Sequence, residues 1–165
     1  SLEIARGAEE NPTFKSSMQL GAGRLTRKFL KGDPFTSKSL EALEEFLEDA
    51  IAPLAQSLST FEKNVATGTS KTFRTLAKIA NSNYPKTGPH LTLDALDQIV
   101  PTLQKLDIKG RRELQSVSAE RAPQIVAGAM VARQLMRTLE LEEIRICPWA
   151  LREGIVLHRL DWIER

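Results

Sequence analysis

The chain has 165 residues, of which 41% are hydrophobic and 27% charged, and its mean hydropathy is −0.26. These values are typical of one compact, soluble domain, and they exclude a disordered chain, a membrane-spanning chain and a second full domain. The formal net charge of only +2 gives too weak an overall field to indicate a nucleic-acid partner, so the local distribution of charge matters more.

The first part of the chain predicts a hairpin followed by a short helix. Two strand-like runs, residues 1–6 and 16–20, flank a polar stretch in which residues 11–12 indicate a turn. A short basic helix is expected after residues 21–23 and through residue 30. The Gly-Asp-Pro sequence at 32–34 then ends this helix.

The segment from Ser37 to Leu58 carries the strongest helix signal. Its apolar residues recur every three or four positions, which is the spacing of an amphipathic helix with one buried face. Pro53 lacks a backbone donor and clashes with the preceding turn, so we expect a bend or an early end near it.

The rest of the chain alternates strands with helices. We expect a strand and turn at 64–70, a strand at 143–147, helices at 71–80, 92–106, 123–139 and 151–160, an exposed loop at 81–90 and a separate turn at 119–122. This order predicts an α/β fold in which helices flank a mixed sheet. We expect the opening hairpin, the strand before Gly68 and the strand ending near Cys147 to share that sheet.

We expect a cytoplasmic protein. Residues 1–7 lack the basic, apolar and small-residue zones of a secretory signal, and no segment is apolar enough to span a membrane. The single cysteine, Cys147, cannot form an internal disulfide, which fits a reducing compartment.

Two local clusters of basic residues have two interpretations. The first cluster contains Arg24, Arg27, Lys28 and Lys31, and the second contains Lys109, Arg111 and Arg112. Either cluster is a solvated surface or a binding site for a polyanion, and the sequence leaves both interpretations open.

The stretch from Thr67 to Thr72 is a candidate phosphate site. It lies between a predicted strand and the start of a helix, where backbone N–H groups, hydroxyls and Lys71 would all donate to an anion. A P-loop is rejected, because the first glycine of that motif is missing. The alternative is a helix cap made of small residues.

Ser1 and Glu3 form a second candidate. Side chains two positions apart on a strand point to the same face, so a carboxylate for a metal would lie beside a hydroxyl donor for phosphate. The alternative is a pair of solvent-facing side chains on a strand.

Five stretches of the chain, in the same order, resemble the exopolyphosphatase / guanosine pentaphosphate phosphatase family, and most of all its actinobacterial members. They are Ser1-Leu2-Glu3 and residues 21–26, 68–74, 117–128 and 146–154. The resemblance implies a ribonuclease-H-like lobe of the actin and sugar-kinase superfamily. It identifies residues 1–165 as the second, C-terminal lobe of a two-lobe phosphatase, truncated at its N-terminal edge and lacking the first central strand of its sheet.

The resemblance also implies roles for individual residues. It assigns Glu3 to a site for Mg²⁺, and it gives phosphate contacts to Ser1, Gly68, Thr69, Ser70, Lys71 and Arg121. No catalytic residue is expected in this chain, because the family's general-base glutamate belongs to the other lobe. One lobe should therefore bind substrate without turning it over.

Two functions follow from the resemblance. The first is the substrate- and metal-binding lobe of an exopolyphosphatase that releases terminal phosphate from polyphosphate, with guanosine pentaphosphate as a further substrate. The alternative is a regulatory module that binds guanosine penta- or tetraphosphate with little hydrolysis. The expected partners are these anions, the missing N-terminal lobe and a second copy in a homodimer; neither nucleic acid nor a membrane is expected.

Overall fold

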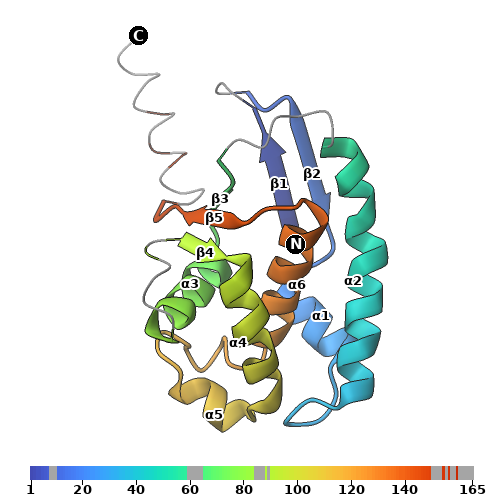
Figure 1. Ribbon diagram of the computed structural model, residues 1–165, viewed down its shortest axis with the longest axis vertical. Helices are drawn as coiled ribbons and strands as arrows, with labels where there is room; N and C mark the ends of the chain where they lie inside the picture. Colours follow the sequence, from blue (N-terminus) through green and yellow to red (C-terminus); the bar gives the residue numbers. More distant parts are fainter. Residues whose placement is uncertain are drawn as a thin grey trace.

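The computed structural model describes residues 1–7, 11–58, 65–83, 88, 90–149, 154, 156 and 159. Its strands gather at one end of the molecule and most of its helices lie at the other (Figure 1). In chain order the elements are β1 (Leu2–Arg6), β2 (Phe14–Met18), α1 (Ala22–Phe29), α2 (Ser37–Leu58), β3 (Thr67–Gly68), α3 (Lys71–Asn83), β4 (His90–Thr92), α4 (Leu93–Lys105), α5 (Ile108–Glu113), α6 (Ile125–Thr138) and β5 (Glu143–Ile146).

The expected hairpin is confirmed. Strands β1 and β2 pair antiparallel, with Leu2 opposite Met18 and Arg6 opposite Phe14, and half-buried residues alternate with exposed ones along both strands. This alternation is the period of two that a strand with one covered face requires. Strand β2 begins two residues earlier than the sequence indicated.

The remaining strands form a second, mixed sheet in the order β3-β5-β4. Strand β3 runs parallel to β5 and β4 runs antiparallel to it. The expectation that the hairpin shares this sheet is wrong within the described residues: β1 pairs only with β2, and a cavity lies between the start of β1 and β3. The edge of β1 that faces β3 is therefore not paired with any described strand, and a missing central strand at this place stays a prediction.

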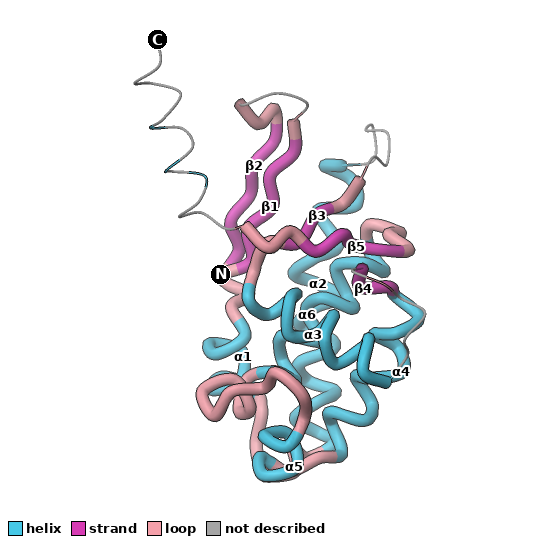
Figure 2. The backbone as a smooth tube through the Cα atoms, turned by 90° about the vertical axis from the view of Figure 1, so that its left-hand side faces the viewer, coloured by secondary structure: helices cyan, strands magenta, loops and turns pink. Residues whose placement is uncertain are grey.

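Helix α6 forms the centre of the hydrophobic core. Nearly all of its side chains are buried, and it packs against α1, α2, α3 and α4 (Figure 2). A helix that is apolar on nearly every side must be covered by several neighbours, so its sequence requires the surrounding helices. None of the described helices is both long enough and apolar enough to cross a membrane.

Two ion pairs fasten α6 to its neighbours at its polar edge. Arg133 bonds the carboxylate of Glu44 on α2 at 2.7 Å, and Arg137 bonds Asp97 on α4 at 2.6 Å. Burial lowers the pKa of the Arg133 guanidinium, and the nearby carboxylate of Glu44 opposes that shift.

Several helix and strand boundaries differ from those expected from the sequence. Helix α2 continues past Pro53. A proline has no N–H to donate to the carbonyl one turn earlier, but Pro53 is exposed, so water can solvate that carbonyl. The expected loop at 81–90 contains the end of α3 and, at His90, the start of β4. The expected helix at 151–160 lies outside the described residues except for Gly154, Val156 and Arg159, which are helical.

A short helix, α5, was not expected, and two aspartates stabilise its start. Asp107 is the N-cap and accepts a hydrogen bond from the N–H of Gly110 at 2.7 Å. Asp33, far away in the sequence, accepts the N–H of Ile108 at 2.8 Å. Both carboxylates therefore satisfy donors that have no partner inside the helix.

The second basic cluster is not a continuous surface. Arg111 is 1% exposed, forms an ion pair with Asp33 and lies with its guanidinium 4.4 Å from the centroid of the Phe35 ring. Only Lys109 and Arg112 are exposed. Arg111 therefore joins α5 to the loop after α1, and the polyanion interpretation of this cluster is wrong for that residue.

We expect Asp33→Ala to destabilise the chain by about 2 to 3 kcal/mol. The substitution leaves the buried guanidinium of Arg111 without its carboxylate and removes an acceptor from the start of α5. Urea unfolding followed by circular dichroism measures the loss. Asp49→Ala, at an exposed position on α2, is the control, and equal unfolding midpoints for the two variants would contradict the role of Asp33.

Candidate phosphate-binding site

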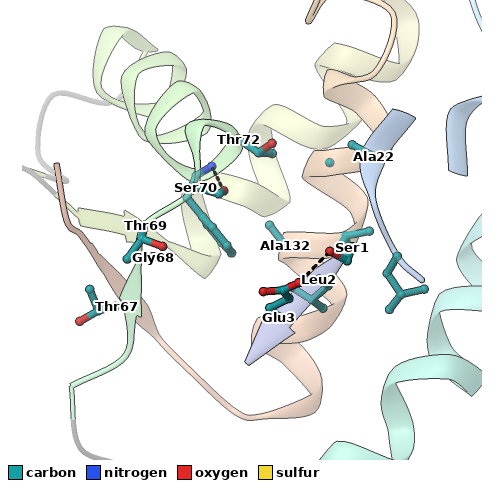
Figure 3. A pocket seen from close by; sticks show the side chains of 14 residues that line it. Ser1, Leu2, Glu3, Ala22, Thr67, Gly68, Thr69, Ser70, Thr72 and Ala132 are labelled. Atoms are coloured by element: carbon teal, nitrogen blue, oxygen red, sulfur yellow. Dashed lines mark hydrogen bonds between the residues drawn. The ribbon is translucent and has the colours of Figure 1, made fainter. Parts of the chain in front are cut away.

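A cavity of about 410 Å³ lies between β1 and the turn that joins β3 to α3. Four parts of the chain line it: the start of β1, the start of α1, the β3–α3 turn and one face of α6 (Figure 3). Two of these parts are the candidate sites found in the sequence. The fold therefore brings together two candidate sites that lie far apart in the sequence.

The first wall carries Ser1 and Glu3. The hydroxyl of Ser1 donates to a carboxylate oxygen of Glu3 at 3.0 Å, so the two side chains share a face, as their spacing predicted. Figure 3 shows the carboxylate directed into the space opposite the β3–α3 turn. Glu3 forms no ion pair with any described residue, so its charge remains available to a cation.

The second wall is the turn made by Gly68, Thr69 and Ser70. The carbonyl of Gly68 accepts the N–H of Cys147 at 3.0 Å, which ties this turn to the end of β5. Ser70 Oγ accepts the N–H of Phe73 at 3.2 Å, so the serine caps α3, as the helix-cap interpretation of this stretch predicts. Its own hydroxyl proton is not used by that bond and can still be donated to an anion.

Two helices begin at the cavity. Helix α1 starts at Ala22 and α3 starts at Lys71, and neither has an acidic residue in its first turn. The first N–H groups of a helix have no partner inside it, and they lie at the positive end of the helix dipole. Two such ends at one cavity favour a bound anion.

Gly21, the N-cap of α1, allows the first wall to approach closely. A Cβ atom at this position would lie 2.6 Å from the backbone nitrogen of Ser1. No residue with a side chain fits there unless Ser1 moves. The glycine therefore sets how near the start of β1 comes to the start of α1.

The floor is made of small residues, of which only Thr72 belongs to a candidate site found in the sequence. Gly128 and Ala132 lie four positions apart on one face of α6, and Ala22 and Thr72 meet them from α1 and α3. A Cβ atom at Gly128 would lie 2.7 Å from Cγ2 of Thr72. The spacing of Gly128 and Ala132 is the signal that could have indicated a close contact.

The structure does not bring every expected phosphate ligand to the cavity. Lys71 is exposed at the first position of α3 and does not line the cavity. Arg121 belongs to the turn before α6, where its N–H bonds the carbonyl of Ser118 at 2.9 Å, and it does not line the cavity either. A phosphate contact by either residue stays a prediction.

The residues present fit a magnesium ion only in part. Within the described residues, no group of three or more Asp, Glu, His or Cys side chains converges, and Glu3 is the sole carboxylate in the lining. Mg²⁺ is commonly held by one or two carboxylates together with substrate phosphates and water. Glu3 therefore fits as one protein ligand of a metal that the substrate helps to bind.

Comparisons with known proteins agree on one family. The model of the Ppx/GppA phosphatase family matches residues 1–162. Exopolyphosphatase 1 of Mycobacterium tuberculosis is 43% identical over 98% of this chain and 48% of its own length. A guanosine-5'-triphosphate,3'-diphosphate pyrophosphatase of Vibrio parahaemolyticus is 24% identical over 100% of this chain and 33% of its own length. The chain thus spans about half the length of its mycobacterial relative.

A solved structure shows the same fold. The Ppx/GppA family member of Aquifex aeolicus superposes with a TM-score of 0.84 at 24% identity, over 99% of this chain and 54% of that one. The expected α/β fold is therefore confirmed, and it is the fold of a solved Ppx/GppA protein.

We expect Gly128→Ala to destabilise the chain by about 1 to 3 kcal/mol, because its methyl group would press on Cγ2 of Thr72. Thr72→Ser removes that methyl group and keeps the hydroxyl, so the double variant should regain most of the loss. A double-mutant cycle of urea unfolding measures the coupling. Additive effects of the two substitutions would show that α3 and α6 do not meet at this point.

Proposed function

This chain belongs to the Ppx/GppA phosphatase family, and we propose that it is the substrate- and metal-binding lobe of an exopolyphosphatase that releases terminal phosphate from inorganic polyphosphate. The observation that carries this proposal is the cavity. Two helix starts, a hydroxyl-rich turn and one carboxylate meet there. Such an arrangement suits a phosphate group that is bound together with a cation.

The donors of the cavity would orient the phosphate. Thr69 and Ser70 would donate from the β3–α3 turn, opposite the wall of Ser1 and Glu3, so the anion would be held between two walls. Phosphoryl transfer depends chiefly on such positioning and on electrostatic stabilisation.

Glu3 would hold Mg²⁺ at the same place. When it is bound, the metal neutralises charge on the phosphates. The hydrogen bond from Ser1 keeps the carboxylate of Glu3 on the cavity side of β1. Ser1 would therefore orient the metal ligand, and its single hydroxyl proton would turn to the phosphate only when the metal replaces that bond at Glu3.

The attacking water needs a general base that the described lining does not supply. Glu3 is its only carboxylate, and a carboxylate that holds a cation is a poor proton acceptor. We therefore assign the base to another part of the protein that carries this chain. On this proposal the 165-residue chain binds polyphosphate and does not turn it over.

The Vibrio relative is named a guanosine-5'-triphosphate,3'-diphosphate pyrophosphatase, which supports guanosine pentaphosphate as a further ligand of this chain. The second candidate function is the binding of guanosine penta- or tetraphosphate with little hydrolysis. The phosphate-binding features of the cavity suit both ligands. Phosphate release from polyphosphate and from guanosine pentaphosphate, measured side by side with the protein that carries this chain, separates the two functions. No release from either, together with tight binding of the nucleotide, would favour the regulatory module.

In the protein that carries this chain, Glu3→Gln should lower turnover on polyphosphate by roughly 100-fold at limiting Mg²⁺, because loss of a metal ligand weakens stabilisation of the transition state. Raising Mg²⁺ should restore part of the rate. Lys71→Ala should mainly raise KM, because Lys71 would add only a uniform contact to phosphate. Steady-state kinetics at several Mg²⁺ concentrations measures both effects.

A clear result would reject the metal assignment: near-normal turnover of Glu3→Gln at limiting Mg²⁺. Lys71→Ala serves as the comparison, since it changes a charge next to the cavity without removing a carboxylate. Circular dichroism of both variants should match the unsubstituted protein, because both side chains are exposed.

A further inference from the structure

Helix α1 carries a row of basic residues on its solvent side, which we call the basic stripe. Its members are Arg24, Arg27, Lys28 and Lys31, and all four are exposed. Arg24, Arg27 and Lys28 follow the spacing i, i+3, i+4, which puts them on one side of α1, and Lys31 comes just after the extended C-cap residue Leu30. The opposite side of α1 is buried through Leu25. The stripe extends over roughly 10 Å.

The basic stripe is not neutralised by nearby carboxylates. None of its four residues forms an ion pair with a described residue, although α2 beside it is rich in glutamate. Lys28 instead lies over two aromatic rings, 4.9 Å from the centroid of Phe29 and 4.7 Å from that of Phe46. The cations of this stripe therefore remain open to an anion from solution.

Arg24 is the residue that ordinary surface chemistry does not explain. Cations in the last turn of a helix are favourable, which accounts for Arg27 and Lys28. Arg24 lies in the first turn, where the helix dipole disfavours a positive charge, and no acidic residue in that turn offsets it. A bound anion next to the start of α1 would offset it. Violations of such local rules concentrate at functional sites.

The basic stripe begins at the cavity. Ala22, the first residue of α1, lines the cavity, and Arg24 follows two positions later. From there α1 runs away from the N-terminal end of β1 (Figure 2). Ala22 lies on the side of α1 opposite the stripe, so a ligand must be long enough to pass around the start of the helix before it reaches Arg24.

We propose that the basic stripe is a second anion subsite, which holds phosphates of a linear polyphosphate beyond those in the cavity. This inference rests on the proposed function, because it takes the cavity as the site of the terminal phosphates. The subsite recognises an extended polyanion by charge alone. It makes affinity depend on chain length, because a short oligophosphate fills the cavity and does not reach the stripe.

Polyphosphate suits the stripe better than single-stranded nucleic acid. Binding of single strands combines cations with exposed aromatic faces on which bases stack. The two rings beside the stripe, Phe29 and Phe46, are half-buried and lie beneath Lys28. The stripe thus offers charge without a stacking platform.

The test compares two double variants of the protein that carries this chain. Arg24→Gln/Arg27→Gln removes two charges from the stripe, and Lys109→Gln/Arg112→Gln removes two exposed charges from α5. Calorimetry gives Kd for tripolyphosphate and for long-chain polyphosphate at several salt concentrations. The stripe variant should bind the long chain roughly tenfold more weakly, with a shallower salt dependence, and bind tripolyphosphate unchanged. The α5 variant should match the unsubstituted protein.

Equal losses on both ligands, or equal losses in both double variants, would overturn the subsite. So would a stripe variant whose affinity falls more for a single-stranded oligonucleotide than for long-chain polyphosphate. Thr69→Val tests the cavity separately and should weaken tripolyphosphate binding. If Thr69→Val leaves that binding unchanged, the proposed function of the cavity fails. The stripe variant then still shows whether the basic stripe binds long-chain polyphosphate.

Discussion

The burial of α6 on all sides is the constraint on which the rest of this structure depends. A helix without a solvent face must be covered by several neighbours, and here α1, α2, α3 and α4 all pack on it. Because α1 and α3 both meet α6 near Gly128, their N-terminal ends lie at the same cavity. The anion site is thus a consequence of core packing: one apolar helix sets the positions of two polar helix ends. Arg133 and Arg137 keep the covering helices in register through Glu44 and Asp97.

Much of the fold could be predicted from sequence because its main elements carry strong periodic signals. The apolar spacing of α2 and the alternation of the hairpin each identify an element without reference to the rest of the chain. The missed elements are too short for periodicity: β4 has three residues and α5 has six. Local sequence also could not show that a cavity separates the hairpin from the second sheet, or that Arg111 turns inward to Asp33 while its neighbours stay exposed. Both depend on contacts between distant segments.

The residues of the candidate site also fall into two groups: those that short sequence segments reveal and those that only the fold brings together. Ser1 and Glu3 are two residues apart, and the β3–α3 turn is one continuous stretch, so both could be found by reading short segments. The floor contributed by Ala22, Thr72 and Gly128 comes from three helices and has no local signature. Lys71 differs from these residues. Its position beside a hydroxyl-rich turn indicates a ligand, but the first residue of α3 is exposed and does not line the cavity, so its contact with phosphate stays a prediction.

The pairing of β3 with β5 also bears on how the chain acquires its cavity during folding. The hairpin joins residues close in sequence and can form by fast local closure, which builds the wall of Ser1 and Glu3 early. Strand β3 has only two residues and is held by β5, with Thr67 opposite Arg145 and the carbonyl of Gly68 bonded to Cys147. Such a parallel pair must close a very long loop, which is slow. During synthesis the opposite wall therefore takes shape only after Cys147 has left the ribosome, so a nascent chain shorter than that has no complete anion site.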